Sequence, residues 1–262
     1  MDLINPLLPE QRRQLILEII KSDYTARSSQ LSQHLKVSEM TIRRDLAALE
    51  RQGMVKRTHG GAVFRHERMT DKFKYQESKE ENPEEKEKIA RMAAELIEPH
   101  DVVFIGEGTT ASMILSYVDR DMPCTVFSNN CGITAEIGST ALTAELILLG
   151  GKYNPVTYST AGNVTLEIIE RINANKVFLG VDAFSLRTGL TTSSQDIAAI
   201  NRAMIRNTTG SVIIMSHHTK FGLVAAMEIA KAKEIDILIT NLKMPKDFNN
   251  DLVAMDVEVV MA

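Results

Sequence analysis

The sequence is poor in several features that would each point to a particular class of protein. It has no run of about 18 or more apolar residues, so we expect no membrane-spanning helix. Its first residues, MDLINPLLPEQRR, lack a basic start that leads into an apolar core, so we expect no secretory signal. The only two cysteines, Cys124 and Cys131, form no CxxC motif, which predicts free thiols in a reducing, cytoplasmic compartment and no zinc site.

Common catalytic and nucleotide-binding patterns are also missing. There is no Ser-His-Asp arrangement and no HExxH motif, and the glycines match neither a P-loop nor a dinucleotide-binding fingerprint. The neighbouring histidines His217 and His218 are poorly placed to converge on one ion, so we expect them to be structural or to contact a ligand. The sequence therefore predicts a protein that is not an enzyme and that holds no metal or cofactor.

Charge is distributed unevenly along the chain. The net charge of the 262 residues is −4, which by itself argues against a nucleic-acid-binding protein. Residues 1–65, however, contain 11 lysines and arginines against 7 aspartates and glutamates, which gives +4 and leaves −8 for the remainder. This asymmetry predicts a basic N-terminal module joined to an acidic body.

The basic module has the pattern of a winged helix-turn-helix. Apolar residues at helical spacing predict one helix over about 9–21 and a second after Ser28, which we expect to be its N-cap. A short turn leads to a third helix, which is capped by Ser38 and ended by Gly53. The stretch MVKRTHGGAVF that follows predicts a β-hairpin, so residues 1–65 form the predicted DNA-binding domain.

The third helix has an apolar face and a basic face. Ile42, Leu46 and Leu49 share the first, and Arg44 and Arg51 lie opposite. In a helix-turn-helix the opening turn of this helix enters the major groove, where arginine binds guanine edges or phosphates. The hairpin would add contacts to the DNA backbone or the minor groove. The predicted DNA-binding residues are Ser38, Glu39, Met40, Thr41, Arg43, Arg44, Lys56, Arg57, His59 and Gly60.

The rest of the chain has the pattern of an α/β domain. Residues 66–82 are charged and poor in apolar side chains, which predicts a linker. Asn82 and Pro83 then suit the start of a helix. From residue 102, apolar runs (VVFI, CTVF, ELILL, KVFLGV, SVIIM, IDILIT, VEVVM) alternate with helical or loop stretches. These runs predict strands buried on both faces, hence a mostly parallel sheet covered by helices over residues 83–262.

Several loops of this domain suit an anion. Gly106–Thr110 follows a predicted strand and opens a helix, where backbone N–H groups and hydroxyls favour phosphate. Similar glycine-, threonine- or asparagine-rich loops follow other strands, near the edge at which open α/β sheets bind ligands. The predicted ligand-binding residues are Glu107, Gly108, Thr109, Thr110, Asn129, Gly150, Gly151, Lys152, Asp182, Thr191, Thr192, His217 and Lys220.

With these motifs in place, the chain resembles the DeoR family of bacterial transcription regulators. The resemblance lies in VSEMTIRRDLAALERQGMVKRTHGGAV and continues in NPEEKEKIA, GTT, LGGK, GVDAFS, TGLTT, NRAMI and HTKFG. It implies a C-terminal sensor with a fold related to ribose-5-phosphate isomerase. It also implies control, by default repression, of genes for the catabolism of a sugar or sugar derivative, relieved by a phosphorylated metabolite.

The sequence departs from the family pattern at several polar positions. Gly106, followed by Glu107, replaces the aspartate that precedes the GTT loop; Ile197 replaces a glutamate, Asn201 a lysine, and His217 an aspartate. Asp182 is retained. Either the ligand differs from the usual sugar phosphate, or the pocket is no longer used. We favour a different ligand, because the loops suited to phosphate survive.

Three functions are compatible with these features of the sequence. We favour a regulator that binds double-stranded operator DNA as a homo-oligomer, a dimer or tetramer, because one winged helix makes few base contacts. The alternative is a sugar-phosphate isomerase-type enzyme with a DNA-binding appendage, for which Asp182 and Lys220 would be the candidate base or electrophile. A third is an architectural DNA-binding protein whose body binds nothing, which a pocket-forming acidic domain argues against.

Overall fold

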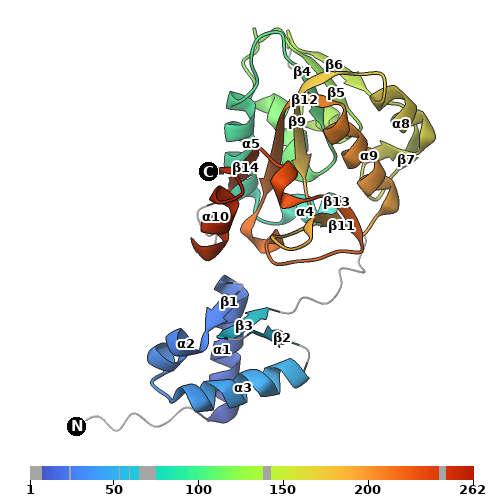
Figure 1. Cartoon of the computed structure of the whole chain (residues 1–262). Coiled ribbons are helices and arrows are strands. Elements are labelled where there is room, and N and C mark those ends of the chain that lie inside the picture. The colour runs from blue at the N-terminus through green and yellow to red at the C-terminus, as the bar shows by residue number, and fades with distance from the viewer. Residues whose placement is uncertain are drawn as a thin grey trace. The chain divides into compact units, whose positions relative to one another are not determined.

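The computed structural model describes residues 8–23, 25–52, 54–58, 60–64, 75–137, 143–241 and 246–262. The chain divides into two compact units, Met1–Glu67 and Arg68–Ala262 (Figure 1). In the described residues, no helix has the length and apolarity that crossing a membrane requires.

The N-terminal unit packs three helices against a small antiparallel sheet with the strand order β1–β3–β2. Its elements are α1 (Pro9–Asp23), β1 (Thr25–Arg27), α2 (Ser28–Leu35), α3 (Glu39–Arg51), β2 (Val55–Arg57) and β3 (Gly61–Phe64). The core is formed by Ile16, Ile20 and Leu31 together with the predicted buried face of α3. The predicted helices and hairpin are confirmed, and β1 adds a strand that the sequence pattern did not indicate.

Of the two N-caps predicted for this unit, one is confirmed and the other is wrong. Ser38 is the N-cap of α3, and its Oγ accepts a hydrogen bond from the Thr41 N–H at 3.2 Å. The prediction that Ser28 caps α2 is wrong, because β1 extends through Arg27 and Ser28 is already the first helical residue. The Ser28 N–H is instead satisfied by the Gly60 carbonyl, at 2.8 Å. Gly53, the predicted end of α3, lies outside the described residues.

All seven apolar runs of the second unit are strands of one parallel sheet. Its order is β15–β14–β12–β9–β4–β5–β6, and every neighbouring pair is parallel. The strands are β4 (Val102–Ile105), β5 (Thr125–Ser128), β6 (Glu145–Leu148), β9 (Ala174–Gly180), β12 (Thr208–Ser216), β14 (Ile237–Thr240) and β15 (Glu258–Met261). The predicted α/β sheet is thus confirmed.

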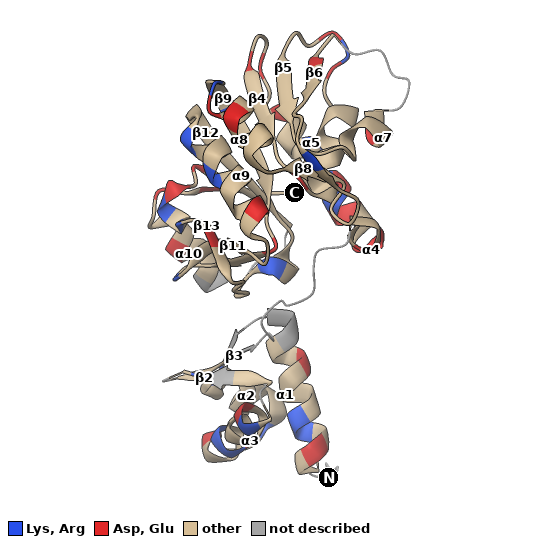
Figure 2. Ribbon diagram, turned by 90° about the vertical axis from the view of Figure 1, so that its right-hand side faces the viewer, with Lys and Arg blue, Asp and Glu red and all other residues tan. Residues whose placement is uncertain are grey.

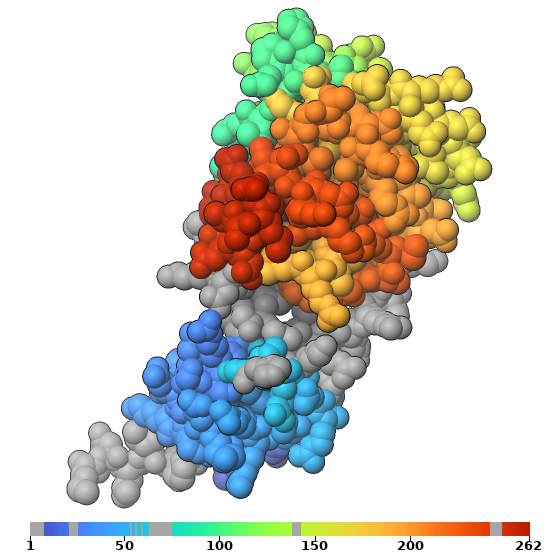
Figure 3. All heavy atoms as spheres, in the orientation of Figure 1, coloured from blue at the N-terminus to red at the C-terminus, as the bar shows by residue number. Residues whose placement is uncertain are grey.

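Helices cover both faces of this sheet, as expected for strands without polar alternation. Val103, Ile105 and Phe178 pack on one face with α5 (Pro83–Glu95), α6 (Thr109–Met113) and α7 (Ile133–Ile137). Phe104 and Val177 pack on the other face with α8 (Asn163–Ile169), α9 (Gln195–Arg206) and α10 (Lys246–Val253). The yellow, orange and red atoms of this second helical layer form the surface seen in Figure 3.

The described residues of this unit also form two small antiparallel sheets. One has the order β10–β11–β13, from β10 (Ala183–Ser185), β11 (Gly189–Thr192) and β13 (Met227–Ala230). The other pairs β7 (Lys152–Asn154) with β8 (Ser159–Ala161). Short 3-10 helices in the described part of this unit cover Ile114–Ser116, His218–Lys220 and Ala232–Glu234.

Part of the predicted linker 66–82 is instead a helix of the second unit. Helix α4 (Tyr75–Glu80) is anchored by Tyr75, which is 3% exposed and donates from Oη to Ser112 Oγ at 2.8 Å. The Tyr75 ring stacks on Tyr158, and its hydroxyl occupies the space where a Cβ of Gly132 would lie. One aromatic residue thus fixes a segment whose overall composition is that of a linker. The remainder of the prediction, residues 66–74, lies outside the described residues.

A buried ion pair joins α1 to α3. Arg12 Nε donates to Asp45 Oδ2 at 2.6 Å, and the two side chains are 11% and 8% exposed. The Arg43–Glu39 pair on the same helix spans 3.5 Å, with side chains 60% and 48% exposed. Water screens the second pair and not the first, so their contributions to stability differ.

We expect Asp45→Ala to lower the free energy of unfolding of the N-terminal unit by about 3 kcal/mol, because it removes the buried carboxylate to which Arg12 Nε donates. The control Glu39→Ala removes the exposed pair and costs less than about 1 kcal/mol. Amide hydrogen exchange of α3 in the full-length protein measures both values. Equal losses for the two variants would contradict the distinction.

Candidate functional site

The opening turn of α3 presents a polar and basic surface. Met40 is 60% exposed, and Arg43 and Arg44 are exposed beside it. Ser38 Oγ lies 2.9 Å from Thr41 Oγ1, which fixes both hydroxyls at the helix start. Glu39 pairs with Arg43 along the same turn. Figure 2 shows basic residues on this helix, all of them arginines, with acidic residues between them. The predicted contact residues of α3 therefore lie on its solvent face.

The hairpin lies next to this surface. Arg57 is exposed, and its backbone N–H donates to Glu50 Oε1 of α3 at 2.9 Å, which ties the strand to the helix. Arg43 and Arg57 both line one concave surface between α3 and the hairpin. Gly60 is exposed with open space at its Cβ position. Lys56 lies in β2, its side chain is not described, and His59 lies outside the described residues.

In the second unit, a pocket lies where the strand order reverses. From β4 the chain builds β5 and β6 on one side, then crosses to β9 and builds β12, β14 and β15 on the other. Open α/β sheets bind ligands outside the carboxyl ends of strands at such a switch point. The pocket is lined from the ends of β4, β9 and β12, which are neighbours in the sheet.

The pocket contains about 580 Å³ of empty space, a volume that includes open solvent at its mouth. Its walls come from α4, α5, α9 and the small sheet as well as from the three strand ends. The lining residues are Ser78, Lys86, Glu107, Gly108, Thr109, Thr110, Gly180, Val181, Asp182, Thr192, Ile197, Asn201, Met215, His217, Lys220 and Ile229.

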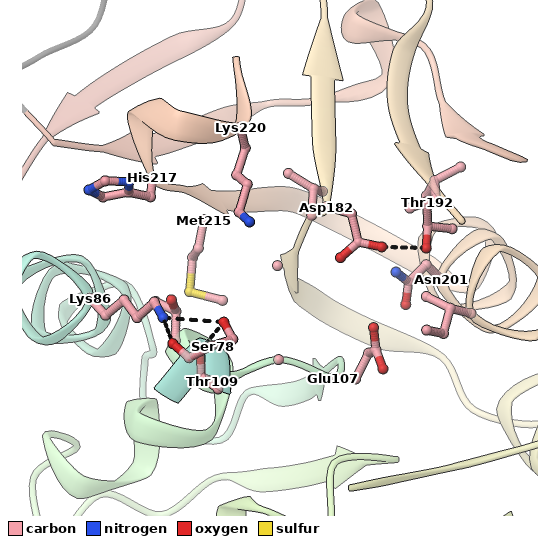
Figure 4. Close-up of a pocket in the computed structure, with 16 residues that line it drawn as sticks. Ser78, Lys86, Glu107, Thr109, Asp182, Thr192, Asn201, Met215, His217 and Lys220 are labelled. Carbon is pink, nitrogen blue, oxygen red and sulfur yellow. Dashed lines mark hydrogen bonds between the residues drawn. The ribbon is translucent and has the colours of Figure 1, made fainter. Parts of the chain in front are cut away.

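One side of the pocket is cationic. Lys86 of α5 and Lys220 both line it, and Figure 4 shows their amino groups on the same side. Lys86 Nζ donates to the Ser78 carbonyl and to Ser78 Oγ. Burial and the nearby Lys220 lower the pKa of Lys86 to about 8. Burial, followed by His218, lowers the pKa of His217 to about 4, so this imidazole is neutral at neutral pH. The positive charge therefore belongs to the two lysines.

The opposite side carries oxygen acceptors. Thr192 Oγ1 donates to Asp182 Oδ2 at 2.6 Å, and Ser159 Oγ donates to Glu107 Oε2 at 3.3 Å. Asn201 is 2% exposed, and its Oδ1 has no hydrogen-bond partner among the described residues. Figure 4 shows Asp182, Thr192, Asn201 and Glu107 at the right of the pocket, Lys86 at its left, and the amino group of Lys220 between Lys86 and Asp182. Charge is thus separated within one cavity.

Glu107 is buried in this acceptor side, and its ionisation follows from that position. Burial is the main cause that raises the pKa of Glu107 to about 8, and the Asp182 carboxylate raises it further. At neutral pH Glu107 is therefore largely protonated. An anion bound nearby would meet a neutral carboxylic acid and not a second negative charge.

Of the residues predicted to bind ligand, eight line the pocket: Glu107, Gly108, Thr109, Thr110, Asp182, Thr192, His217 and Lys220. The other five lie elsewhere. Asn129 follows β5 and donates to the Thr160 carbonyl, and Thr191 accepts from the Ala225 N–H on the opposite face of β11 from Thr192. Gly150, Gly151 and Lys152 follow β6, the strand at the edge of the sheet, two strands away from β4.

Sequence reasoning missed two residues on the cationic side. Ser78 was assigned to the linker, and its place in the pocket depends on α4, which no periodicity indicated. Lys86 lies on the buried side of α5, one turn before Ile89 and Ala90. The helical spacing of Lys86 from these core residues could have marked it as a candidate site residue, because a lysine is buried almost only where it has a partner.

Both units resemble domains of known proteins. Residues 81–242 match the family model described as the DeoR C terminal sensor domain, and residues 12–68 match the DeoR-like helix-turn-helix domain. The chain belongs to the DeoR family. Its regulators are named for their transcriptional role, and this chain is accordingly a DNA-binding transcriptional regulator.

Relatives match over nearly the whole chain. The HTH-type transcriptional regulator GlpR of Haloferax volcanii is 31% identical over 97% of this chain and 98% of its own length. The HTH-type transcriptional repressor GlcR of Bacillus subtilis is 31% identical over 93% and 92%. The lactose phosphotransferase system repressor of Streptococcus mutans is 30% identical over 88% and 92%.

The alignments with two solved structures have TM-scores below 0.5. The probable sor operon regulator of Shigella flexneri aligns with a TM-score of 0.44 and 12% identity, over 66% of this chain and 89% of its own. Ribose 5-phosphate isomerase A of Methanocaldococcus jannaschii aligns with a TM-score of 0.39 and 14% identity, over 53% and 55%. The family assignment rests on the sequence matches.

The raised pKa of Glu107 predicts a pH-dependent stability. A carboxyl that holds its proton more tightly when folded stabilises the protein below its unfolded pKa, and this contribution is lost as pH rises toward the folded value. We expect the free energy of unfolding of the wild type to fall by about 2 kcal/mol relative to Glu107→Gln between about pH 6.5 and 8.5. Urea denaturation at several pH values measures this. Parallel pH curves for the two proteins would contradict the burial of an ionisable Glu107.

Proposed function

We propose that the protein represses genes of carbohydrate catabolism, and that a phosphorylated sugar or sugar derivative in the C-terminal pocket releases it from operator DNA. The observation that carries the proposal is the pair Lys86 and Lys220 at one end of a pocket at the switch point of the sheet. Two lysines within a largely buried cavity suit a phosphate, which is small, doubly charged and rich in acceptors. A relative named as the lactose phosphotransferase system repressor supports the carbohydrate assignment.

DNA recognition is assigned to the opening turn of α3 and to the hairpin. The exposed Arg43 and Arg44 are free of the core, while Ile42 and Leu46 on the other face hold the helix in place. Arginines on such a turn bind guanine edges bidentately or pair with phosphates. A second half-site requires a second copy of the domain, so we expect a homo-oligomer on the operator.

Ligand binding is linked along the chain to the DNA-binding unit through α4. Lys86 holds Ser78 of this helix, and α4 is the first described element after residues 65–74, which lead from the hairpin. A phosphate that attracts Lys86 competes with the Ser78 oxygens for its protons. We propose that the two states of this contact favour different positions of α4, which is the differential interaction that regulation requires.

Asp182 and Lys220, the candidate catalytic residues of the enzyme alternative, both line the pocket, but other lining residues argue for binding. Ile197 and Asn201, which line it from α9, carry no ionisable group, and Lys86 is engaged by Ser78. We therefore propose that the second unit senses its ligand without converting it.

Arg44→Ala tests the DNA-binding assignment. We expect it to weaken binding to an operator, obtained by selection from random duplexes with the wild-type protein, by about 5- to 100-fold. The control Arg13→Ala removes the same charge from α1, where Arg13 Nε donates to the Pro9 carbonyl. Mobility-shift titrations at two salt concentrations measure both. Equal effects of the two variants would exclude Arg44 as a specific contact.

Lys220→Ala tests the phosphate site. We expect phosphorylated sugars that raise the melting temperature of the wild type to bind this variant at least about tenfold more weakly, because one of two phosphate cations is lost. Lys233→Ala, an exposed lysine in the Ala232–Glu234 turn, should bind as the wild type does. The same compounds should release wild-type protein from its operator. Stabilisation that survives Lys220→Ala would place the phosphate elsewhere.

A further inference from the structure

The acceptor side of the pocket contains more negative charge than its own residues balance. Asp182 is 9% exposed, and its described contact is the 2.6 Å hydrogen bond from Thr192. In the part of the chain that the structure describes, no lysine, arginine or histidine forms an ion pair with it. A buried carboxylate without a cation is costly, so a buried carboxylate normally has a charged partner.

Two further acceptors face the same space. Asn201 Oδ1 is buried without a hydrogen-bond partner among the described residues, and Glu107 accepts one long hydrogen bond from Ser159 at 3.3 Å. Figure 4 shows the Asp182, Asn201 and Glu107 side chains around one end of the cavity. An uncharged sugar hydroxyl satisfies one or two of these acceptors and leaves the charge of Asp182 unbalanced. A primary ammonium has three donors and a positive charge.

We propose that the ligand carries an ammonium group as well as a phosphate, and that Asp182, Glu107 and Asn201 bind the ammonium while Lys86 and Lys220 bind the phosphate. This rests on the proposed function, because it assumes that the pocket is the effector site. The ligand class is a phosphorylated amino sugar or amino alcohol with a free amine.

In the unliganded protein, a proton on Glu107 takes the place of the missing cation. Its pKa of about 8 means that this proton is present in most molecules at pH 7. The incoming ammonium stabilises the ionised carboxylate, so the proton leaves Glu107 and passes to the buffer as the ligand binds. The other charged or titratable groups facing the cavity, Lys86, Lys220 and His217, lie on the cationic side. We expect the protons that these groups gain or lose when phosphate binds to be the same for amine and hydroxyl ligands.

Matched ligand pairs test the proposal with the full-length protein. The pairs are glucosamine 6-phosphate with glucose 6-phosphate, galactosamine 6-phosphate with galactose 6-phosphate, and 2-aminoethyl phosphate with 2-hydroxyethyl phosphate. Isothermal titration calorimetry at pH 7, in two buffers of different ionisation enthalpy, gives the affinity and the number of protons released. In at least one pair, the amine should bind at least about tenfold more tightly than the alcohol and release about one more proton.

Variants identify the residue that releases the proton. In Glu107→Gln the additional proton release should vanish, and the preference for the amine should fall below about threefold. Asp182→Asn should lower the same preference and provides a second test if Glu107→Gln does not fold. The control Glu95→Gln, an exposed carboxylate of α5 outside the pocket, should behave as the wild type does.

The outcomes separate this inference from the proposed function. If alcohols bind as tightly as amines in every pair that binds, or if the amine preference is unchanged in both pocket variants, the ammonium site is excluded while a phosphate sensor remains. If none of the six phosphates binds, both proposals are wrong. Tight amine binding with proton release that depends on Glu107 supports both.

Discussion

The parallel arrangement of the seven-stranded sheet is the constraint on which the rest of the C-terminal unit depends. Because every strand runs in the same direction, all carboxyl ends meet at one edge, and the chain must reverse its strand order once to place strands on both sides of β4. The reversal leaves β4 and β9 as neighbours whose following loops diverge. Glu107 and Asp182 come from these two loops, and their proximity results from topology and not from sequence separation.

Burial then decides the electrostatics of the pocket. Lys86 loses part of its preference for the charged form, and Glu107 keeps its proton well above the usual pH range for a carboxyl. Both shifts have burial as their main cause, and both are strengthened by a like charge, Lys220 in one case and Asp182 in the other. Among the described residues, neither the two pocket lysines nor Asp182 forms an ion pair, and a ligand with opposite charges at its two ends would complement both sides of the pocket.

The sequence predicted the fold far better than it predicted the site. Apolar runs such as VVFI and SVIIM need only burial to become strands, and the seven of them predicted the sheet. Anion-binding loops are local patterns, however, and they do not reveal strand order. The loop at Gly150–Lys152 looks as suitable as the one at Gly106–Thr110, but it follows the edge strand β6. Ser78 and Lys86 were missed because one lies on a helix held by Tyr75 and the other is a buried lysine.

The departures from the family pattern gain a physical meaning from this geometry. Ile197, Asn201 and His217 line the one pocket, and so does Glu107, which follows the changed position Gly106. The changes therefore affect a single chemical environment. Where the family pattern has a lysine, Asn201 offers an amide, which leaves Asp182 without a cation from α9. Drift in an unused pocket has no reason to retain Lys220 and Asp182 while removing the residue that would balance the acid. A changed ligand that carries its own cation would instead favour keeping the lysines that suit phosphate. It would also favour an Asp182 that has no cation from the protein beside it.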